Sequence, residues 1–398
     1  MYKGVAVTGM GIISSIGNTV DENFQSLIER KHGISRIKKI ETIHKNSIMV
    51  GEIDLSNDEL IHFLGLPENN NYSRTALLGE VAAKEAVKNA QISDIDSYKT
   101  GLISATSVGG MDMTEKYYYS QFDESKNRKF IECHPAGDSS TKIAKSLGIN
   151  DFVTTISTAC SSSANAIMLG ARMIKAGKLD RVIVGGTDCL SKFTINGFKT
   201  LMILSESNCK PFDENRTGLN LGEAAAYLVL ESDEIVKKEN KKIIAHVSGY
   251  ANTNDAFHQT ASSDNGEGAT LAMKKALEVA NLSPENIDYI NAHGTATSNN
   301  DKSESKAILR VFGDNIPSLS STKSYTGHTL AAAAAIEAVY SILSLQKDVI
   351  FPNLNYKTAI SETGIIPVTE VLKKRSYHVL SNSFGFGGNC STLIFSKS

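Results

Sequence analysis

Short runs of β-branched and aliphatic residues alternate along the chain with longer segments in which apolar residues recur every three or four positions. The short runs predict strands and the periodic segments predict helices. Strands separated by helices are typical of α/β proteins, whose largely parallel sheets carry helices on both faces. Strands are predicted at 5–11, 100–107, 152–157, 181–186, 242–251, 287–298 (with a turn), 378–388 and 391–397. Helices are predicted at 21–31, 110–120, 162–177, 269–282 and 330–346.

The second part of the chain repeats the order of the first. The segment SATS has its counterpart in NAHGTATS, TTISTAC with its helix corresponds to SSTKSYTGHT with its helix, and IVGGTD corresponds to SFGFGG. Because the spacings between these landmarks differ, the repeat is one of structure rather than of sequence. The charged segment 231–242 is the predicted connection. It divides the chain into an N-terminal half, 1–242, and a C-terminal half, 243–398.

One cysteine lies where a predicted strand changes into a predicted helix. Residues 154–158 read Thr-Thr-Ile-Ser-Thr, Cys160 follows shortly after, and helical spacing begins beyond residues 161–163. At a helix start, unpaired backbone N–H groups and the helix dipole favour negative charge. A lowered pKa and a nucleophilic thiolate are therefore expected for Cys160. On this segment alone, a buried structural cysteine explains the pattern equally well.

Two histidines occupy the same kind of position as Cys160. His293 follows the apolar run 287–290, and His328 stands beside Gly327 just before an alanine-rich helix. Ligands bind at the carboxyl ends of the strands in parallel α/β sheets, so the cysteine and both histidines are expected at one site. A single histidine in such a position is more often structural, but three groups in equivalent positions favour a site.

A lysine and a glutamate accompany the second histidine. Glu337 is the one charged residue in the predicted helix 330–346, and burying it would require a partner. Lys323, just before the histidine, is the expected partner; the alternative is that Glu337 lies on an exposed edge. Asp301 and Glu304 follow the first histidine closely and are expected either to fix its loop or to cap the next helix.

The glycine-rich loop SNSFGFGG follows a strand near the C-terminus. Glycines let a backbone approach a ligand closely and present its N–H groups. Phe386 lies between two of these glycines and is expected to act as a plug or gate. A tight turn between two strands would also account for the glycines.

The composition argues against several classes of protein. The chain has 398 residues, 41% of them hydrophobic, and a net charge of −2, so it has no basic excess for binding nucleic acid or an anionic membrane surface. No uninterrupted apolar stretch of about 18 residues is present to span a bilayer. Five cysteines without CxxC spacing favour neither disulfides nor a metal site, and a cytoplasmic protein is expected.

The first apolar run is interpreted as a strand rather than a signal peptide. Its continuation, GMGIISSIG at residues 9–17, places the third glycine outside the spacing that dinucleotide-binding loops require. We therefore interpret it as a glycine turn after the first strand.

Together these segments resemble the β-ketoacyl-[acyl carrier protein] synthases, the elongating condensing enzymes with a duplicated thiolase fold. The resemblance rests on motifs spread over nearly the whole chain: VTGMGIISSIGN, STACSSSANAI, GGTD, KPFDENRTG, NAHGTATSNNDKSE, STKSYTGHTLAAAAAIEA and SNSFGFGG. It implies an α/β fold of two similar halves in a layered αβαβα arrangement. It also implies an acyltransferase that elongates fatty acid, polyene or polyketide chains.

The resemblance implies a decarboxylative condensation. Cys160 attacks the thioester of an acyl carrier protein and holds the acyl chain, while the backbone N–H groups of Cys160 and Phe386 stabilise the oxyanion. His293 and His328 then donate hydrogen bonds to the malonyl thioester carbonyl. Carbon dioxide leaves, and the enolate attacks the acyl-cysteine to give a 3-oxoacyl-[acyl carrier protein].

The resemblance also implies supporting residues and partners. Lys323 and Glu337 hold the histidines, and Phe386 gates the acyl pocket. The residues implied to contact substrate are Thr295 and Thr297, on the pantetheine arm, and Phe384, Phe386 and Gly387. No cofactor or metal is implied, because the phosphopantetheine arm arrives on the acyl carrier protein. The second implied partner is another subunit, identical or paralogous, with no nucleic acid and no membrane.

The chain departs from the family pattern at three places. Thr217 replaces the aspartate of an RDG segment, with alanines at 224–225 where glycine and alanine are common. Residues 389–390 read Asn-Cys where the common motif GFGGTN has Thr-Asn. These two departures bear on the acyl pocket. At 206–207, Glu and Ser stand where the family often has an arginine, which bears on carrier docking.

Two alternatives stay open at the level of sequence. A thiolase, which condenses acyl-CoA, shares the fold and the cysteine nucleophile but needs a second cysteine as base, for which Cys390 is the candidate. An inactive chain-length-determining partner shares the shape, but such subunits usually lack the nucleophile that Cys160 supplies.

Overall fold

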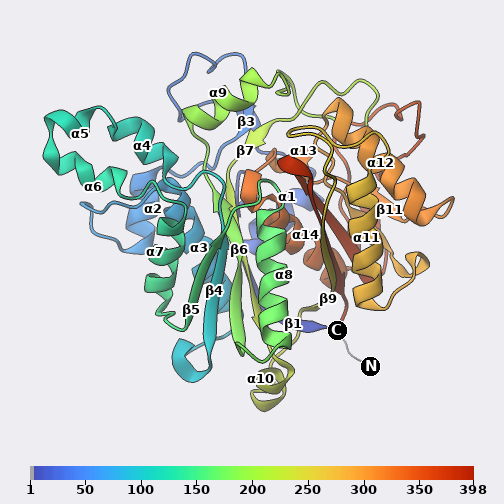
Figure 1. Cartoon of the computed structure of the whole chain (residues 1–398), viewed down its shortest axis with the longest axis horizontal. Helices are drawn as coiled ribbons and strands as arrows, with labels where there is room; N and C mark the ends of the chain where they lie inside the picture. The colour runs from blue at the N-terminus through green and yellow to red at the C-terminus, as the bar shows by residue number, and fades with distance from the viewer. Residues whose placement is uncertain (1–3) are drawn as a thin grey trace.

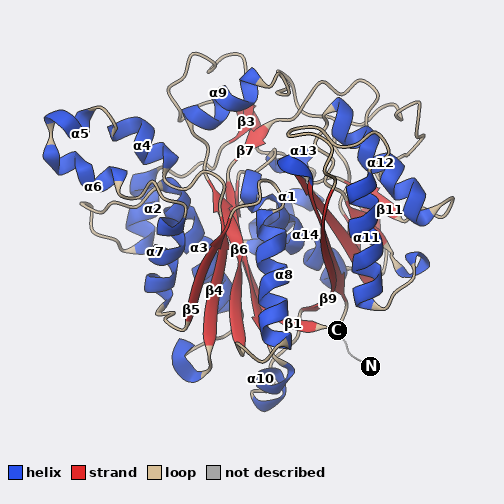
Figure 2. Cartoon of the chain, in the orientation of Figure 1, coloured by secondary structure: helices blue, strands red, loops and turns tan. Residues whose placement is uncertain are grey.

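The structure, a computed structural model, describes residues 4–398. Ten strands form one hydrogen-bonded sheet (Figures 1 and 2). Across the sheet they lie in the order β11 (Ser318–Ser320), β10 (Tyr289–Asn291), β14 (His378–Gly385), β15 (Asn389–Ser396), β9 (Ala245–Asn254), β1 (Val5–Ser14), β8 (Ala224–Glu231), β6 (Arg181–Asp188), β4 (Thr100–Ala105) and β5 (Phe152–Ile156). Every predicted strand overlaps one of these, whereas β8 and β11 were not predicted.

The two halves of this sheet have the same topology. In chain order the first half contains β1, β4, β5, β6 and β8, and the second contains β9, β10, β11, β14 and β15. In each half the third strand lies at the edge, followed by the second, fourth, fifth and first. The two first strands, β1 and β9, pair antiparallel and join the halves. The predicted duplication is confirmed, while the boundary at residue 243, between β8 and β9, stays a prediction.

The sheet is mixed rather than parallel. Parallel pairing links β4 to β5 and β6, and β10 to β11 and β14. The central strands pair antiparallel throughout. One cause is the β14–β15 connection, which spans only Phe386–Gly388, because a connection this short can join only antiparallel strands. The expectation of parallel sheets is therefore wrong for the central strands.

Four long helices complete five layers in the order αβαβα. On the outer faces, α3 (Arg74–Asn89) covers β1, β6 and β8, and α11 (Glu267–Ala280) covers β9 and β15. Between the halves lie α8 (Ser162–Lys175) and α14 (Ala333–Lys347), which contact each other (Figure 1). Each central helix follows the third strand of its half. The turns that carry Cys160 and His328 therefore occupy equivalent places in the duplicated fold.

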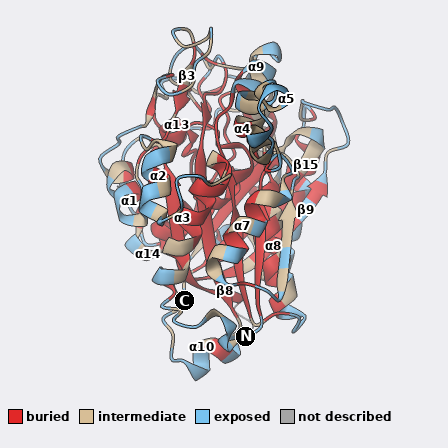
Figure 3. Cartoon of the chain, turned by 90° about the vertical axis from the view of Figure 1, so that its left-hand side faces the viewer, coloured by how far each residue is buried: buried red, intermediate tan, exposed pale blue. Residues whose placement is uncertain are grey.

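The central helix α14 lies within the core of the protein. All its residues from Ala333 to Leu345 are buried, and Figure 3 shows that the strands around it are buried as well. Within residues 4–398, one window, Leu330–Lys347, is long and apolar enough by composition to cross a membrane, and 89% of it is buried inside the protein. Its apolar surface is thus covered by other parts of the fold.

Gly9 and Gly11 lie inside β1, so the predicted glycine turn after the first strand is wrong. The helix α3 crosses this strand so closely that a Cβ at Gly11 would lie 2.2 Å from the carbonyl oxygen of Ala82. A Cβ at Gly9 would lie 2.4 Å from the carbonyl oxygen of Ala86. These glycines therefore serve helix–strand packing rather than a turn.

Smaller elements surround this framework. The remaining α-helices are α1 (Val20–Ile28), α2 (Asn57–Leu64), α4 (Met111–Tyr117), α5 (Ser120–Asp123), α6 (Arg128–Ile131), α7 (Gly137–Leu147), α9 (Lys192–Thr200), α10 (Asp233–Lys238), α12 (Ser298–Phe312) and α13 (Lys323–Thr326). Two small sheets contain β2 (Ile34–Arg36), β3 (Met49–Gly51) and β7 (Leu221–Gly222), and β12 (Val349–Ile350) and β13 (Leu372–Lys373). All five cysteines are free and buried.

Candidate active site

The turn between β5 and α8 presents Cys160 to a cavity. The strand ends at Ile156 and the helix begins at Ser162, so the chain turns within five residues. Ala159 takes a left-handed backbone conformation with φ of 52°, which L-residues rarely adopt. The Ser162 hydroxyl holds this turn, since its Oγ accepts the N–H of Thr158 at 2.8 Å and donates to the carbonyl oxygen of Ala159.

Burial dominates the acidity of the Cys160 thiol. The residue is 6% exposed, and desolvation raises its pKa to about 11. The Lys323 charge and hydrogen bonds from the backbone N–H groups of Phe386 and Cys160 oppose this shift but do not cancel it. The expected lowering of the pKa is therefore wrong for the resting protein, in which Cys160 is a thiol. The same two N–H groups lie at its sulfur, as oxyanion donors would.

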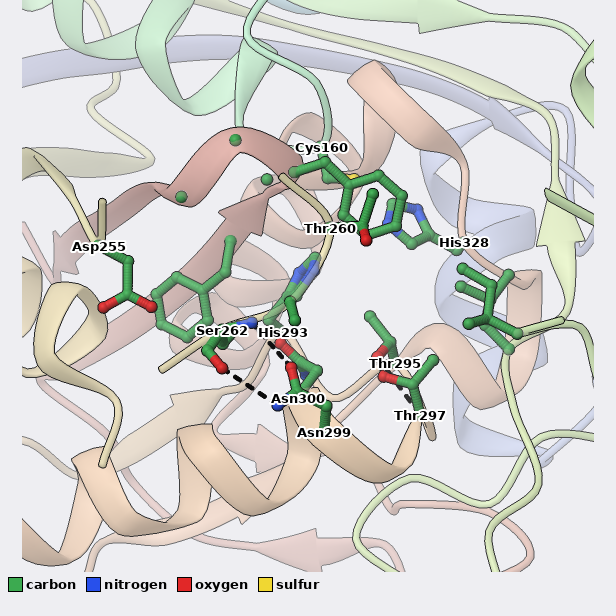
Figure 4. Close-up of a pocket in the computed structure, with 18 of the residues that line it drawn as sticks. Cys160, Asp255, Thr260, Ser262, His293, Thr295, Thr297, Asn299, Asn300 and His328 are labelled. Carbon is green, nitrogen blue, oxygen red and sulfur yellow. Dashed lines mark hydrogen bonds between the residues drawn. The ribbon is translucent and has the colours of Figure 1, made fainter. Parts of the chain in front are cut away.

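Both predicted histidines line the same cavity as Cys160. His293 follows β10 and His328 lies between α13 and α14, whereas Cys160 comes from the other half of the chain. The two imidazole rings meet edge to face, with centroids 5.4 Å apart and an angle of 89° between their planes. Figure 4 shows the three side chains pointing toward one another. The site is thus assembled across the two halves.

The hydrogen bonds of the histidines fix where their protons lie. Nδ1 of His328 accepts the backbone N–H of Leu330 at 3.0 Å, and Nδ1 of His293 lies 3.1 Å from the ammonium of Lys323, which can only donate. Burial, with the Lys323 charge second, lowers the pKa of both imidazoles well below the usual value. Both rings are therefore neutral at pH 7, and each carries its proton on Nε2.

A buried ion pair supports His293. Nζ of Lys323 lies 2.5 Å from Oε1 of Glu337 and donates to the carbonyl oxygen of His293 at 2.6 Å. The two charged side chains are 3% and 1% exposed. Burial raises the pKa of Glu337 to about 7, and Lys323 opposes that shift. The predicted pairing is confirmed, and the alternative of an exposed Glu337 is wrong.

Two carboxylates fix the loop that carries His293. Glu304 accepts the backbone N–H groups of His293 at 2.9 Å and Gly294 at 2.8 Å. Asp301 accepts the backbone N–H of Ala296 at 3.1 Å. Burial raises the pKa of Glu304 to about 7 despite these bonds. Asp301 and Glu304 were expected either to fix this loop or to cap the next helix, and the structure shows both of them fixing the loop.

The cavity also brings together the other residues predicted to contact substrate: Thr295, Thr297, Phe384, Phe386 and Gly387. The threonine hydroxyls lie 2.8 Å apart and further along the cavity than the histidines (Figure 4). Lys323 and Glu337 do not line the cavity but lie behind His293. Across residues 4–398, no three His, Cys, Asp or Glu side chains are grouped so that they could hold a metal ion.

A second cavity, of about 350 Å³ and almost wholly apolar, also has Cys160 in its lining. Its lining includes Val108, Phe193, Phe198 and Leu330, and Phe386 lines both cavities. Phe386 stacks on Phe198 with ring centroids 5.9 Å apart. The loop does form the tight turn between two strands, and it also places Phe386 between the two cavities.

Sequence reasoning missed two residues near the nucleophile. Phe198 lies on α9, in a short segment with no pattern that marks a pocket. Asp188 ends β6 and is fully buried; it accepts the backbone N–H groups of Ser107 at 3.0 Å and Ala331 at 2.8 Å. It thereby joins the wall of the apolar cavity to the turn before α14. A lone carboxylate after an apolar strand was the signal that could have identified it.

The chain matches the family models of the β-ketoacyl synthase N-terminal domain over residues 3–235 and C-terminal domain over residues 244–357. The 3-oxoacyl-[acyl-carrier-protein] synthase 2 of Staphylococcus aureus (strain N315) is 34% identical to it over 409 residues, which cover 99% of this chain and 98% of that protein.

Solved structures resemble the chain along its whole length. The ishigamide ketosynthase/chain length factor superposes with a TM-score of 0.93 at 29% identity, with both chains fully covered. A type II polyketide synthase acyl-carrier protein in complex with its ketosynthase superposes with a TM-score of 0.86 at 26% identity, again covering both chains. These neighbours share the duplicated fold described above.

Proposed function

The chain belongs to the β-ketoacyl synthase family, and we propose that it condenses an acyl group held on Cys160 with malonyl-[acyl carrier protein]. The products are a 3-oxoacyl-[acyl carrier protein] and carbon dioxide. The observation that carries this proposal is the convergence of one buried thiol and two neutral Nε2–H donors, from His293 and His328, on one cavity.

In the first step the acyl group moves from the carrier to the protein. The Cys160 sulfur attacks the thioester carbonyl carbon, the new carbon–sulfur bond forms, and the bond to the pantetheine sulfur breaks. The proton of the Cys160 thiol ends on the released pantetheine thiol, so no net charge is created. The N–H groups of Cys160 and Phe386, which lie at the sulfur, stabilise the oxyanion of the tetrahedral intermediate.

In the second step the malonyl thioester takes the place of the released carrier. Its carbonyl oxygen accepts hydrogen bonds from Nε2–H of His293 and His328. The bond to the carboxylate breaks, carbon dioxide leaves, and the electron pair stays on the enolate, which the two donors stabilise. The enolate carbon attacks the acyl carbonyl on Cys160, and the cysteine sulfur leaves with a proton from solvent.

The two cavities suit different parts of the substrate. We assign the pantetheine arm to the cavity that contains Thr295 and Thr297, whose hydroxyls can hydrogen-bond its amides. The apolar cavity beyond Phe386 suits the acyl chain, because it presents almost no polar surface. Fatty acyl, polyene and polyketide chains all use this chemistry.

We further propose that the chain works with an acyl carrier protein and a second subunit of the same fold. Similar proteins are named for both kinds of partner. Within this chain, β5 is an edge strand, and Val153 on it is 40% exposed, so the strand can pair with another chain. Glu206 stands where the family often has an arginine that contacts the acidic carrier protein. It is exposed, and its carboxylate lies 3.5 Å from the ammonium of Lys199.

Neither alternative is favoured. A thiolase would use Cys390 as a base, but the chain matches the β-ketoacyl synthase family models over both halves. An inactive partner has no use for a cysteine and two histidines in one cavity, and these three are all in place.

Mass spectrometry of the protein mixed with acyl carrier proteins bearing different chains tests the proposal. We expect the mass to increase by one acyl group, located on Cys160, and Cys160→Ala to abolish the increase. Release of carbon dioxide from malonyl carrier protein is the second readout. Condensation of acetyl-CoA without malonyl decarboxylation would favour a thiolase. Full activity of a reconstituted system that contains Cys160→Ala would favour the role of an inactive partner subunit.

A further inference from the structure

Asn389, at the point where the Phe386 loop returns to the sheet, contacts three side chains of two other segments through one atom. Its Oδ1 lies 2.6 Å from Oγ of Ser161, 2.6 Å from Nδ2 of Asn252 and 3.1 Å from Nδ2 of Asn165. All three neighbours are donors, so the side-chain carbonyl collects their hydrogen bonds. Two of the donors belong to α8 and its start, and the third belongs to β9.

The donors on the α8 side hold the turn that carries the nucleophile. Ser161 directly follows Cys160, and its single hydroxyl proton is shared between Oδ1 of Asn389 and the carbonyl oxygen of Thr158, which lies 2.8 Å from Oγ. Nδ2 of Asn165 donates to Oγ1 of Thr158 at 2.9 Å. A movement of this network would therefore move the backbone N–H of Cys160.

On the loop side, Asn389 pairs with Gly385 across the β14–β15 hairpin, so these two residues flank Phe386 and the following glycines. Gly385 lies directly against the nucleophile turn: a Cβ there would be 2.8 Å from the carbonyl oxygen of Thr158 and 3.2 Å from the nitrogen of Cys160. The glycines after Phe386 give the loop backbone freedom. Its position relative to the turn thus depends on contacts such as those of Asn389.

We propose that Asn389 is a positioning residue for acyl transfer, which fixes the backbone N–H of Phe386 relative to that of Cys160 so that both donors reach one oxyanion. The inference rests on the proposed function. The two N–H groups come from different halves of the chain, and the Asn389 side chain spans the gap between them. A threonine here would carry its oxygen one bond closer to the backbone than Oδ1, so the asparagine in GFGGNC gives this chain the longer reach.

Asn389→Ala tests the proposal, with Asn389→Asp as the rescue variant, since a carboxylate oxygen still accepts all three hydrogen bonds. We expect Asn389→Ala to slow the acylation of Cys160 by about 10- to 100-fold, as loss of oxyanion stabilisation does. Carbon dioxide release from malonyl carrier protein should stay within about twofold, because it depends on the histidines. Asn389→Asp should recover most of the acylation rate.

The matched control is Asn254→Ala, whose exposed side chain donates to the carbonyl oxygen of Gly387 at 3.3 Å without contacting the nucleophile turn. It should acylate like the unaltered protein. Ser161→Ala should slow acylation, and the double variant with Asn389→Ala should be no slower than the slower single variant. Additive effects, or equal losses of acylation and decarboxylation, would overturn the positioning role.

Alkylation of Cys160 by iodoacetamide gives a readout that needs no carrier substrate. If Asn389→Ala displaces the Phe386 N–H from the sulfur, the thiolate loses a hydrogen bond and alkylation at pH 9 should slow by about threefold. An unchanged alkylation rate would overturn the inference even if the unaltered protein failed to take up acyl groups. That failure alone would instead count against the proposed function.

Discussion

The ammonium of Lys323 lies 3.1 Å from Nδ1 of His293 and donates to the carbonyl oxygen of the same residue at 2.6 Å. A cation at this nitrogen keeps a second proton off the imidazole, so the ring stays neutral with its Nε2–H toward the cavity. The carboxylate of Glu337 forms an ion pair with the lysine ammonium and neutralises its charge. Lys323 therefore sets the charge and orientation of His293 rather than touching the substrate.

Replacing the lysine should separate stability from activity. Lys323→Met leaves Glu337 buried without its cation, which should lower the free energy of unfolding by about 3–5 kcal/mol. Carbon dioxide release should fall by about 10- to 100-fold, because His293 loses its fixed tautomer. Denaturant unfolding and decarboxylation assays measure the two effects.

The double variant Lys323→Met/Glu337→Leu is the control. Removing both charges should restore most of the unfolding free energy, since no unpaired buried charge remains. Activity should stay low. Recovery of activity together with stability would show that the lysine only supports the fold.

The reactivity of Cys160 should rise steeply with pH. Because burial raises the thiol pKa to about 11, the thiolate fraction should increase about tenfold per pH unit between pH 7 and 10. Alkylation rates with iodoacetamide, measured by mass spectrometry of the Cys160 peptide, check this. A plateau below pH 8 would contradict it, and Cys160→Ala controls for labelling of other cysteines.

His328 should make the folded protein sensitive to acid. Its pKa is well below 6.5 in the folded state, so the unfolded state takes up a proton first as the pH falls below 6.5. This contribution to stability is present above pH 6.5 and should be lost by about 1.4 kcal/mol per pH unit below it. Relative to His328→Gln, the unaltered protein should thus lose unfolding free energy between pH 6.5 and 5.

Denaturant unfolding at several pH values measures this difference. His258→Gln, at an exposed histidine, is the matched control variant measured alongside. A constant difference for His328→Gln would show that the imidazole titrates alike in both states.

Phe198 should limit which acyl chains Cys160 accepts. Phe198→Ala removes the ring on which Phe386 stacks and widens the apolar cavity. We expect acylation by long or branched chains to gain about tenfold relative to short chains. Competition between two acyl carrier proteins, read by mass spectrometry, measures the ratio. Phe193→Ala, at a ring that is 62% exposed, should change it far less.

Local patterns were enough to predict most of the framework. Apolar periodicity located eight of the ten strands of the main sheet and three of the four layer helices, but not β8, β11 or α3. The order of motifs revealed the duplication that the strand order confirms. The residue types at strand ends also singled out Cys160, His293 and His328, which the fold brings to one cavity. These predictions succeeded because they depend on residues that are neighbours in sequence and on a connection rule common to α/β folds.

The pairing of Lys323 with Glu337 was predictable for a related reason. A single charge in an apolar helix must find a partner or remain exposed, and Lys323, just before His328, was the natural candidate.

By itself, the sequence determined the order of elements, the two halves and the identity of the chemical groups. The tertiary structure decided the antiparallel centre of the sheet, the glycines of β1 that admit α3, and the high pKa of Cys160. It also decided the histidine tautomers and the contacts of Phe198, Asp188 and Asn389. The physical reason is that desolvation and hydrogen bonding act through space, between groups that are far apart along the chain.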